Sequence, residues 1–277
     1  MMFKNKITFL IVSAMTFYNS FSAFAAISSE CFIATEGNRT VVQEGACDQR
    51  HSSCSTFKIA ISLMGFNEKI LIDETNPKLP FTDKKGNEAL PEWEEDQDPI
   101  TWIKSGCVWY SRFITEKLGM SKLKDYTAKF EYGNQDLSGD KGKNNGLTHA
   151  WLSSSLQISP KEQVNFIQKL LSGKLTPIVS VRAQEFTRKI LFRETLSNGW
   201  KLYGKTGTGV TIKHDDSCKD KNCNKAALSI GWFVGWIEKG DRKIVFAYYL
   251  ECEKKDGHPA GKLAMERACE RLVTLTK

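Results

Sequence analysis

The sequence lacks long apolar runs, internal repeats and low-complexity tracts. The only sustained apolar stretch, residues 7–17, has 11 residues, and a membrane-spanning helix needs about 20. The absence of a repeat excludes solenoid and propeller arrays. The absence of a long linker predicts one domain, or one domain with two lobes, in a chain of this length.

Histidine is scarce, with four scattered residues, and no Cys-x2-Cys pair is present among the eight cysteines. Zinc sites of the common spacings are therefore not expected, and no metal is predicted. A pair inside the lysine-rich stretch, Cys218–Cys223, is the favoured disulfide prediction, and Cys31–Cys47 is the second.

Neither sign of charge dominates. The formal net charge is +7, the basic and acidic residues are interleaved, and removal of two N-terminal lysines leaves +5. This balance gives little support to a nucleic-acid partner and mildly favours small anionic ligands.

The N-terminus has the pattern of an export signal. Lys4 and Lys6 precede the apolar stretch, and Ala23-Phe24-Ala25 supplies small residues for cleavage. We therefore expect a signal peptide over 1–25 and a periplasmic mature chain. Since no cysteine directly follows the cleavage point, a lipid anchor is not predicted.

Sequence periodicity predicts a sheet built from both ends of the chain. Short β-type segments lie on both sides of Gly37-Asn38, and three more follow residue 200, the last two joined at Gly240-Asp241. An amphipathic helix closes the chain over 261–275. The predicted fold class is α+β, an antiparallel sheet flanked by helices plus an all-helical lobe.

Helix signals fill the middle of the chain. We expect helices over 55–66, over the segment that ends at Gly119, after the Ser159-Pro160 start and over the segment that follows Thr176, with 72–104 mostly loop. The predicted boundaries are a single catalytic domain over 26–277, with a sheet lobe from about 26–54 and 198–277 and a helical lobe over about 55–197.

Ser55 and Lys58 are one helical turn apart inside a nearly all-apolar stretch. Two further Ser-x-x-Lys matches lie in polar surroundings, where solvated side chains are expected. Apolar burial favours the neutral amine of a lysine, which can act as a base beside a nucleophilic serine. The alternative is a capped helix whose lysine extends to water.

Lys205-Thr206-Gly207 lies on a predicted strand and is followed by Thr208 and a second glycine. Glycines let a backbone approach a ligand, while the lysine and hydroxyls can bind a carboxylate. The alternative is a strand that merely ends in glycines. Ser-x-x-Lys followed by Lys-Thr-Gly is a known pairing of penicillin-binding proteins and β-lactamases.

Together with Tyr132-Gly133-Asn134 and Trp151-Leu152, these motifs resemble the class D serine β-lactamases over nearly all of the mature chain. The resemblance implies hydrolysis of a β-lactam through a Ser55 acyl-enzyme. It implies that Lys58 reacts with CO2 to become an N-carboxylated general base, with the Trp151 indole N–H as donor to the carbamate. No other cofactor is implied.

The resemblance also assigns the surroundings of these groups. Phe57, Val108, Trp151 and Leu152 are implied as the walls of the lysine pocket. The backbone N–H groups of Ser55 and Thr208 are implied as the oxyanion hole, and Lys205, Thr206, Gly207 and Thr208 as the substrate-binding strand. Cys54, beside the nucleophile, is expected to be a packed thiol.

The chain departs from the family pattern in two places. Where the family has Ser-x-Val, this chain has Ser105-Gly106-Cys107-Val108, and the favoured register puts Gly106 at the serine position. An arginine that many members place after the last strand is replaced by Gly261, and His258 or Lys205 is the expected substitute.

Two other functions remain open on the sequence: the sensor domain of a β-lactam receptor and a penicillin-binding protein, each of which acylates without rapid turnover. The expected partner is a small-molecule β-lactam, with no membrane anchor, in a monomer or homodimer.

Overall fold

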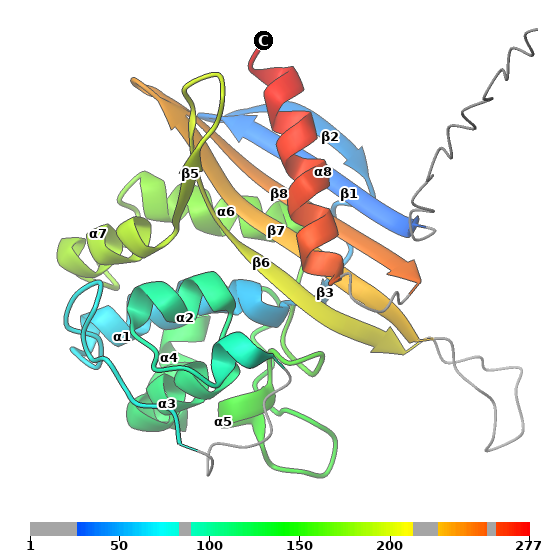
Figure 1. Cartoon of the computed structure of the whole chain (residues 1–277). Helices are drawn as coiled ribbons and strands as arrows, with labels where there is room; N and C mark the ends of the chain where they lie inside the picture. The colour runs from blue at the N-terminus through cyan, green and yellow to red at the C-terminus, as the bar shows by residue number, and fades with distance from the viewer. Residues whose placement is uncertain (1–26, 83–89, 213–226, 254–258) are drawn as a thin grey trace, which may run out of the picture.

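The computed structural model describes residues 27–82, 90–212, 227–253 and 259–277. Its centre is a six-stranded antiparallel sheet in the order β2-β1-β8-β7-β6-β5 (Figure 1). The strands of this sheet are β1 (Ile27–Glu36), β2 (Arg39–Gly45), β5 (Phe192–Thr195), β6 (Lys201–Ile212), β7 (Ala227–Lys239) and β8 (Arg242–Glu253). The α+β prediction is confirmed.

The two ends of the described chain share the sheet, as predicted. β1 pairs with β8, with Cys31 opposite Tyr249, and β2 extends the sheet beyond β1. The two predicted hairpin turns, at Gly37-Asn38 and Gly240-Asp241, are also observed. Because strands from both ends interlock, neither end can leave without exposing the edge of the other.

Helices cover both faces of the sheet. Figure 1 shows α8 (Ala260–Leu275) lying across one face, where its Ala264, Ala268 and Leu272 are fully buried against the sheet. On the opposite face, α6 (Pro160–Leu171) packs against β1 and β8. The helical periodicity of apolar residues thus produces two cores, one on each side of the sheet.

A group of helices lies beside the β6 side of the sheet (Figure 1). It contains the 3-10 turn η1 (Cys54–Phe57), α1 (Lys58–Asn67), η3 (Pro91–Trp93), α2 (Pro99–Ser105), α3 (Val108–Leu118), α4 (Met120–Lys129), α5 (Gly146–His149) and α7 (Val181–Ile190). A short two-stranded sheet, β3 (His51–Ser52) with β4 (Gln157–Ile158), lies near η1.

Most of the described residues in 72–104 are loop, as predicted, but helix α2 at the end of this range was not predicted. Asp98 accepts from the Thr101 N–H and the Thr101 hydroxyl accepts from the Asp98 N–H, which is a capping box, and Pro99 occupies the first helical position. These signals were present in the sequence, but the acidic and proline-rich surroundings obscured them.

One of the two predicted disulfides lies within the described residues. Cys31 and Cys47 are bonded, so the second-ranked pairing is confirmed. The first-ranked pair, Cys218–Cys223, lies outside the described residues. Within the described ranges, no helix has the length and apolar character required to cross a bilayer.

Candidate active site

Ser55 and Lys58 lie at the junction of η1 and α1. The Lys58 Nζ donates a hydrogen bond to the Ser55 Oγ at 2.9 Å. Ser55 is half-buried, whereas Lys58 has no exposed surface. The alternative of a lysine extending to water is therefore wrong, and the amine is held against a hydroxyl that a ligand can reach.

The four residues implied as walls of the lysine pocket are buried or half-buried, and two of them pack on each other. The rings of Phe57 and Trp151 lie 5.8 Å apart, both fully buried, and Val108 is almost fully buried while Leu152 is half-buried. The Trp151 Nε1 is a buried donor that has no hydrogen-bond partner among the described residues. A buried N–H without an acceptor is costly, so this donor fits a site built to receive an oxygen.

Strand β6 passes close to the turn that carries Ser55. A Cβ atom added at Gly207 would lie 3.2 Å from the Cys54 Cβ, and one added at Gly209 would lie 2.5 Å from the Cys54 Sγ. The two glycines therefore permit the backbone of β6 to approach η1. Their predicted role, approach of the backbone to a ligand, stays a prediction.

The direction of the β6 backbone places the Thr208 N–H at the edge facing away from β7. On that edge, the Gly204 N–H donates to the Leu191 carbonyl and the Val210 N–H donates to the Ser153 Oγ. Since N–H directions alternate along a strand and the β6–β7 register is unbroken, the Thr208 N–H points the same way. It is therefore available for an oxyanion, in keeping with the predicted role.

Lys205 is buried, with an exposed fraction of 1%. Its Nζ donates to the Thr206 carbonyl at 3.0 Å and lies 3.3 Å from the Thr206 Oγ1. Burial, followed by the nearby charges of Lys58 and Arg193, holds the pKa of Lys205 well below its usual value. The sequence predicted a cation presented to a carboxylate; the structure places a desolvated lysine beside the Lys58 site.

Gly106 lies against the amine of Lys205. A Cβ at this position would lie 3.4 Å from the Lys205 Nζ, and its φ of +74° is in the left-handed region. The Ser105 hydroxyl is turned away, donating to the Thr101 carbonyl at 2.9 Å. The register that puts Gly106 rather than Ser105 at the site is therefore confirmed.

The second departure from the family pattern also has a structural reason. The Gly261 N–H, at the start of α8, donates to the Thr208 Oγ1 at 3.1 Å. A Cβ at Gly261 would lie 2.6 Å from the Gly207 carbonyl oxygen and 2.6 Å from the Thr208 Oγ1. A side chain therefore cannot be placed at 261 unless β6 or α8 moves. The expected substitute His258 lies outside the described residues, and a carboxylate-binding role of Lys205 stays a prediction.

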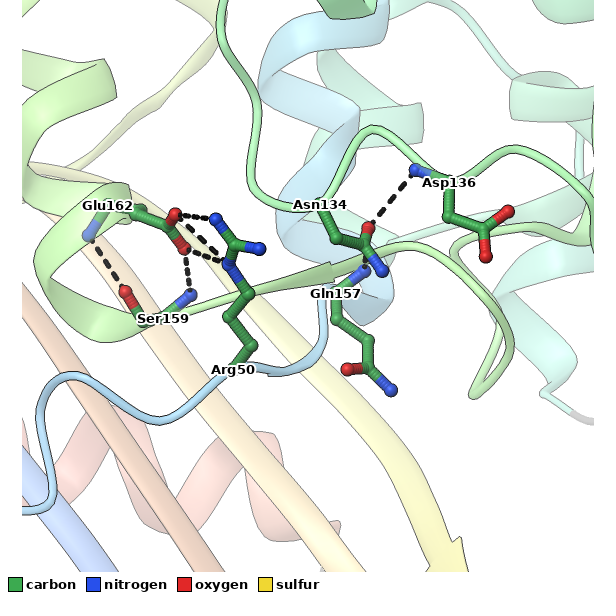
Figure 2. Close-up of polar contacts among 6 residues, drawn as sticks. All are labelled: Arg50, Asn134, Asp136, Gln157, Ser159 and Glu162. Carbon is green, nitrogen blue, oxygen red and sulfur yellow. Dashed lines mark hydrogen bonds and ion pairs between the residues drawn. The ribbon is translucent and has the colours of Figure 1, made fainter.

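The Tyr132-Gly133-Asn134 motif packs against the segment that carries Ser55 and against β4. The Tyr132 ring packs 5.0 Å from the Phe57 ring. Figure 2 shows the Asn134 Oδ1 accepting from the N–H groups of Gln157 and Asp136. These contacts fix the loop against β4 and give Asn134 a structural role.

Long-range polar contacts that the sequence did not reveal hold the segment before Ser55. Arg50 pairs with Glu162, which also closes the capping box of α6 with Ser159 (Figure 2). The Gln163 Nε2 donates to the Thr56 Oγ1 at 2.7 Å. The capping box was readable in the sequence; its ties to residues 50 and 56 were not, because more than 100 residues separate the partners.

Cys54 is a packed thiol, as expected. It is buried, and desolvation raises its pKa to about 12. Since the thiolate is the nucleophilic form, this thiol is unreactive at neutral pH.

These features define a class. A sequence model of the penicillin-binding protein transpeptidase domain matches residues 18–268, and the fold and the order of the motifs agree with it. Within that class, the chain is 39% identical to the β-lactamase OXA-1 of Escherichia coli over 87% of this chain and 86% of the relative. It is 36% identical to OXA-9 of Klebsiella pneumoniae over 87% of this chain and 85% of the relative.

A solved structure, the class D β-lactamase OXA-427, superposes with a TM-score of 0.80 at 38% identity and covers 90% of this chain and 98% of that one. This chain therefore belongs to the class D β-lactamase family. It also resembles the regulatory protein BlaR1 of Bacillus licheniformis, at 29% identity over 90% of this chain but 37% of that protein.

Proposed function

We propose that this protein hydrolyses β-lactam antibiotics through an acyl-enzyme on Ser55 and thereby gives β-lactam resistance. The observation that carries the proposal is the hydrogen bond, at 2.9 Å, between the Ser55 Oγ and the fully buried Lys58 amine. Family membership supports the same reaction, since OXA-1 and OXA-9 are named as β-lactamases.

In the proposed reaction, Ser55 attacks the β-lactam carbonyl while a base at Lys58 takes its proton. The N–H groups of Ser55 and Thr208 stabilise the oxyanion. The hydroxyls of Thr206 and Thr208 bind the carboxylate side of the substrate. Hydrolysis of the acyl-enzyme uses the same base to activate water.

The base is proposed to be Lys58 carrying a carbamate derived from CO2, which supplies a carboxylate-type general base. The residues present fit this group. Lys58 is fully buried, and Trp151 has a buried N–H without an acceptor among the described residues.

A β-lactam sensor is the second candidate, because BlaR1 matches this chain over a third or so of its own length. Both functions require acylation of Ser55, and they differ in the lifetime of the adduct. A penicillin-binding protein would also retain the adduct.

We also propose the location and organisation predicted from the sequence: export to the periplasm by a signal peptide over 1–25, and a single catalytic domain over 26–277. The oligomeric state, monomer or homodimer, stays a prediction.

Intact-mass spectrometry of the mature chain with benzylpenicillin tests the proposal. We expect an adduct on Ser55 that forms and then disappears, and disappears faster when bicarbonate is added. An adduct that persists for hours would favour the sensor or penicillin-binding function and overturn hydrolysis.

The carbamate has a separate test that does not depend on activity. In ¹³C-bicarbonate, a carbamate carbon resonance should appear for the parent chain and weaken in Trp151→Phe, which keeps the ring packing and removes the N–H. Trp109→Phe is the control, since the Trp109 indole donates to the Trp93 carbonyl and not to the lysine site. An undiminished resonance in Trp151→Phe would remove Trp151 from the carbamate site.

A further inference from the structure

A β-lactam nitrogen leaves as an amine only if it receives a proton while its bond to the acyl carbon breaks. The group that donates this proton must lie within reach of the nitrogen of the bound substrate. Residues 105–108, which form the Gly106 side of the site, do not present a side-chain hydroxyl to it. Gly106 has no side chain, Val108 is apolar, and the Ser105 hydroxyl donates to the Thr101 carbonyl.

The amine of Lys205 lies against this side-chain-free position. Its Nζ is 3.4 Å from the site of a Cβ at residue 106, so the ammonium occupies the space beside the missing side chain. The amine of Lys205 can also donate and accept a proton, whereas the guanidinium of an arginine in the same place could not.

The chemistry of the substrate brings its nitrogen to the same place. In a penicillin, the lactam nitrogen is bonded both to the acyl carbon and to the carbon that bears the carboxylate. If the acyl carbon lies at Ser55 and the carboxylate at Thr206, the nitrogen lies between these two residues. The Lys205 Nζ is 3.3 Å from the Thr206 Oγ1 and is therefore close to the expected position of the nitrogen.

We propose that Lys205 is a catalytic residue in this protein, with its ammonium donating the proton to the lactam nitrogen in place of a side-chain hydroxyl at residue 106. The Ser55 Oγ–acyl carbon bond forms, the carbon–nitrogen bond breaks, and the nitrogen takes a proton from Lys205. The base at Lys58 holds the Ser55 proton and returns it to the Lys205 amine through water. The net change is the transfer of one proton from Ser55 to the nitrogen.

The charges around Lys205 explain when this donor is protonated. The groups that act on it are its own desolvation and the positive charges of Lys58 and Arg193, all of which favour the neutral amine. Loss of the positive charge on Lys58, which the proposed function requires, removes one of these repulsions and favours the ammonium. The inference therefore rests on the proposed function and couples the donor to the base.

The test varies the leaving group. The chain is acylated in parallel by benzylpenicillin, whose nitrogen needs a proton, and by the ester of phenylacetylglycine with a hydroxynitrobenzoic acid, whose phenolate does not. In Lys205→Arg, which keeps a positive charge that cannot be given up, we expect benzylpenicillin acylation to fall on the order of 10²-fold. Ester acylation should change only a few-fold.

Lys201→Arg, on the exposed end of the same strand, is the matched control and should leave both rates unchanged. Circular dichroism verifies folding of Lys205→Arg, and Lys205→Met, which packs without a charge, should show the same selective loss of the penicillin reaction. In the parent chain, penicillin acylation should also decline as pH rises through the pKa of Lys205, while ester acylation does not.

Equal losses for the two reagents would show that Lys205 acts through binding or structure, and would overturn the inference while leaving Ser55 acylation intact. Unchanged penicillin acylation in Lys205→Arg would overturn it as well. Failure of the proposed function is distinguishable, because then the parent chain itself forms no penicillin adduct.

Discussion

The two walls of the candidate active site are built in opposite ways. On the η1–α1 wall, Ser55 and Lys58 are one turn apart in sequence and already hydrogen-bonded at 2.9 Å. On the facing wall, the turn between α2 and α3 brings Gly106, which has no side chain, against Lys205 from a distant strand. The first wall is complete as a local sequence motif, whereas the second depends on a contact that only the fold creates.

The strongest test of this comparison removes the nucleophile of the first wall. Ser55→Ala should lower β-lactam hydrolysis on the order of 10³-fold or more, because it removes the hydroxyl that is hydrogen-bonded to the Lys58 amine and is proposed to form the acyl-enzyme. The mass adduct should disappear. Ser62→Ala, in the adjoining helix α1 and with its hydroxyl donating to the Ile59 carbonyl, is the control. Hydrolysis that survives in Ser55→Ala would move the nucleophile elsewhere.

The second wall can be tested by giving it a hydroxyl. Gly106→Ser places an Oγ beside the Lys205 Nζ, and should restore penicillin acylation about tenfold in the Lys205→Arg background. Because φ is +74° at this position, a side chain costs about 1–2 kcal/mol of stability.

Gly106→Ala carries the same backbone strain without the hydroxyl and separates the two effects. Stopped-flow acylation and thermal unfolding are measured on both variants. Equal rates for the serine and alanine variants would show that a hydroxyl on this wall does not matter.

The buried charge of the second wall should reduce stability. Desolvation depresses the pKa of Lys205, so the unfolded chain binds more protons than the folded chain. Stability in the parent chain therefore rises with pH between the folded pKa and the ordinary lysine value of about 10.4.

Lys205→Met should raise the free energy of unfolding by about 1–2 kcal/mol at pH 7, with a smaller gain at pH 9. Urea unfolding at the two pH values measures both quantities. A loss of stability at pH 7, or a gain that grows with pH, would contradict the assignment of Lys205 as a destabilising buried amine.

The smallest effect on stability is expected at His51, close to the segment that carries Ser55. His51 stacks on Tyr249 at 3.8 Å, and burial lowers its pKa despite the nearby Glu251. Its contribution to stability is thus present above the unfolded value of about 6.5 and is lost as pH falls toward the folded pKa. His51→Gln should flatten the fall of unfolding free energy with decreasing pH below 6.5. An unchanged slope would show that another group titrates there.

Local patterns accounted for most of the elements. The capping box at Ser159 and Glu162 and the glycine after Leu118 predicted the start of α6 and the end of α3, because these signals act within one turn. The α2 helix was missed although its cap at Asp98 is equally local. Its seven residues are too few to show a convincing apolar period.

The contacts of the candidate site likewise fall into those that the local sequence predicts and those that it does not. The pairing of Ser55 with Lys58 and the need for glycine in β6 follow from spacing and residue size. The contacts of Asn134 with Gln157, Ser153 with Val210 and Gly261 with Thr208 have no local signal, since each joins segments far apart in the chain.

The sequence by itself determined that Ser55 and Lys58 are neighbours and that Lys205, Thr206 and Gly207 lie on a strand, because helical and strand periodicity fix which side chains lie side by side. The tertiary structure alone decided that Lys58 has no access to water and that Lys205 is desolvated beside Gly106. It also decided that residue 261 has no space for a side chain. Burial and close approach between distant segments depend on how the elements pack, and packing is a property of the whole fold.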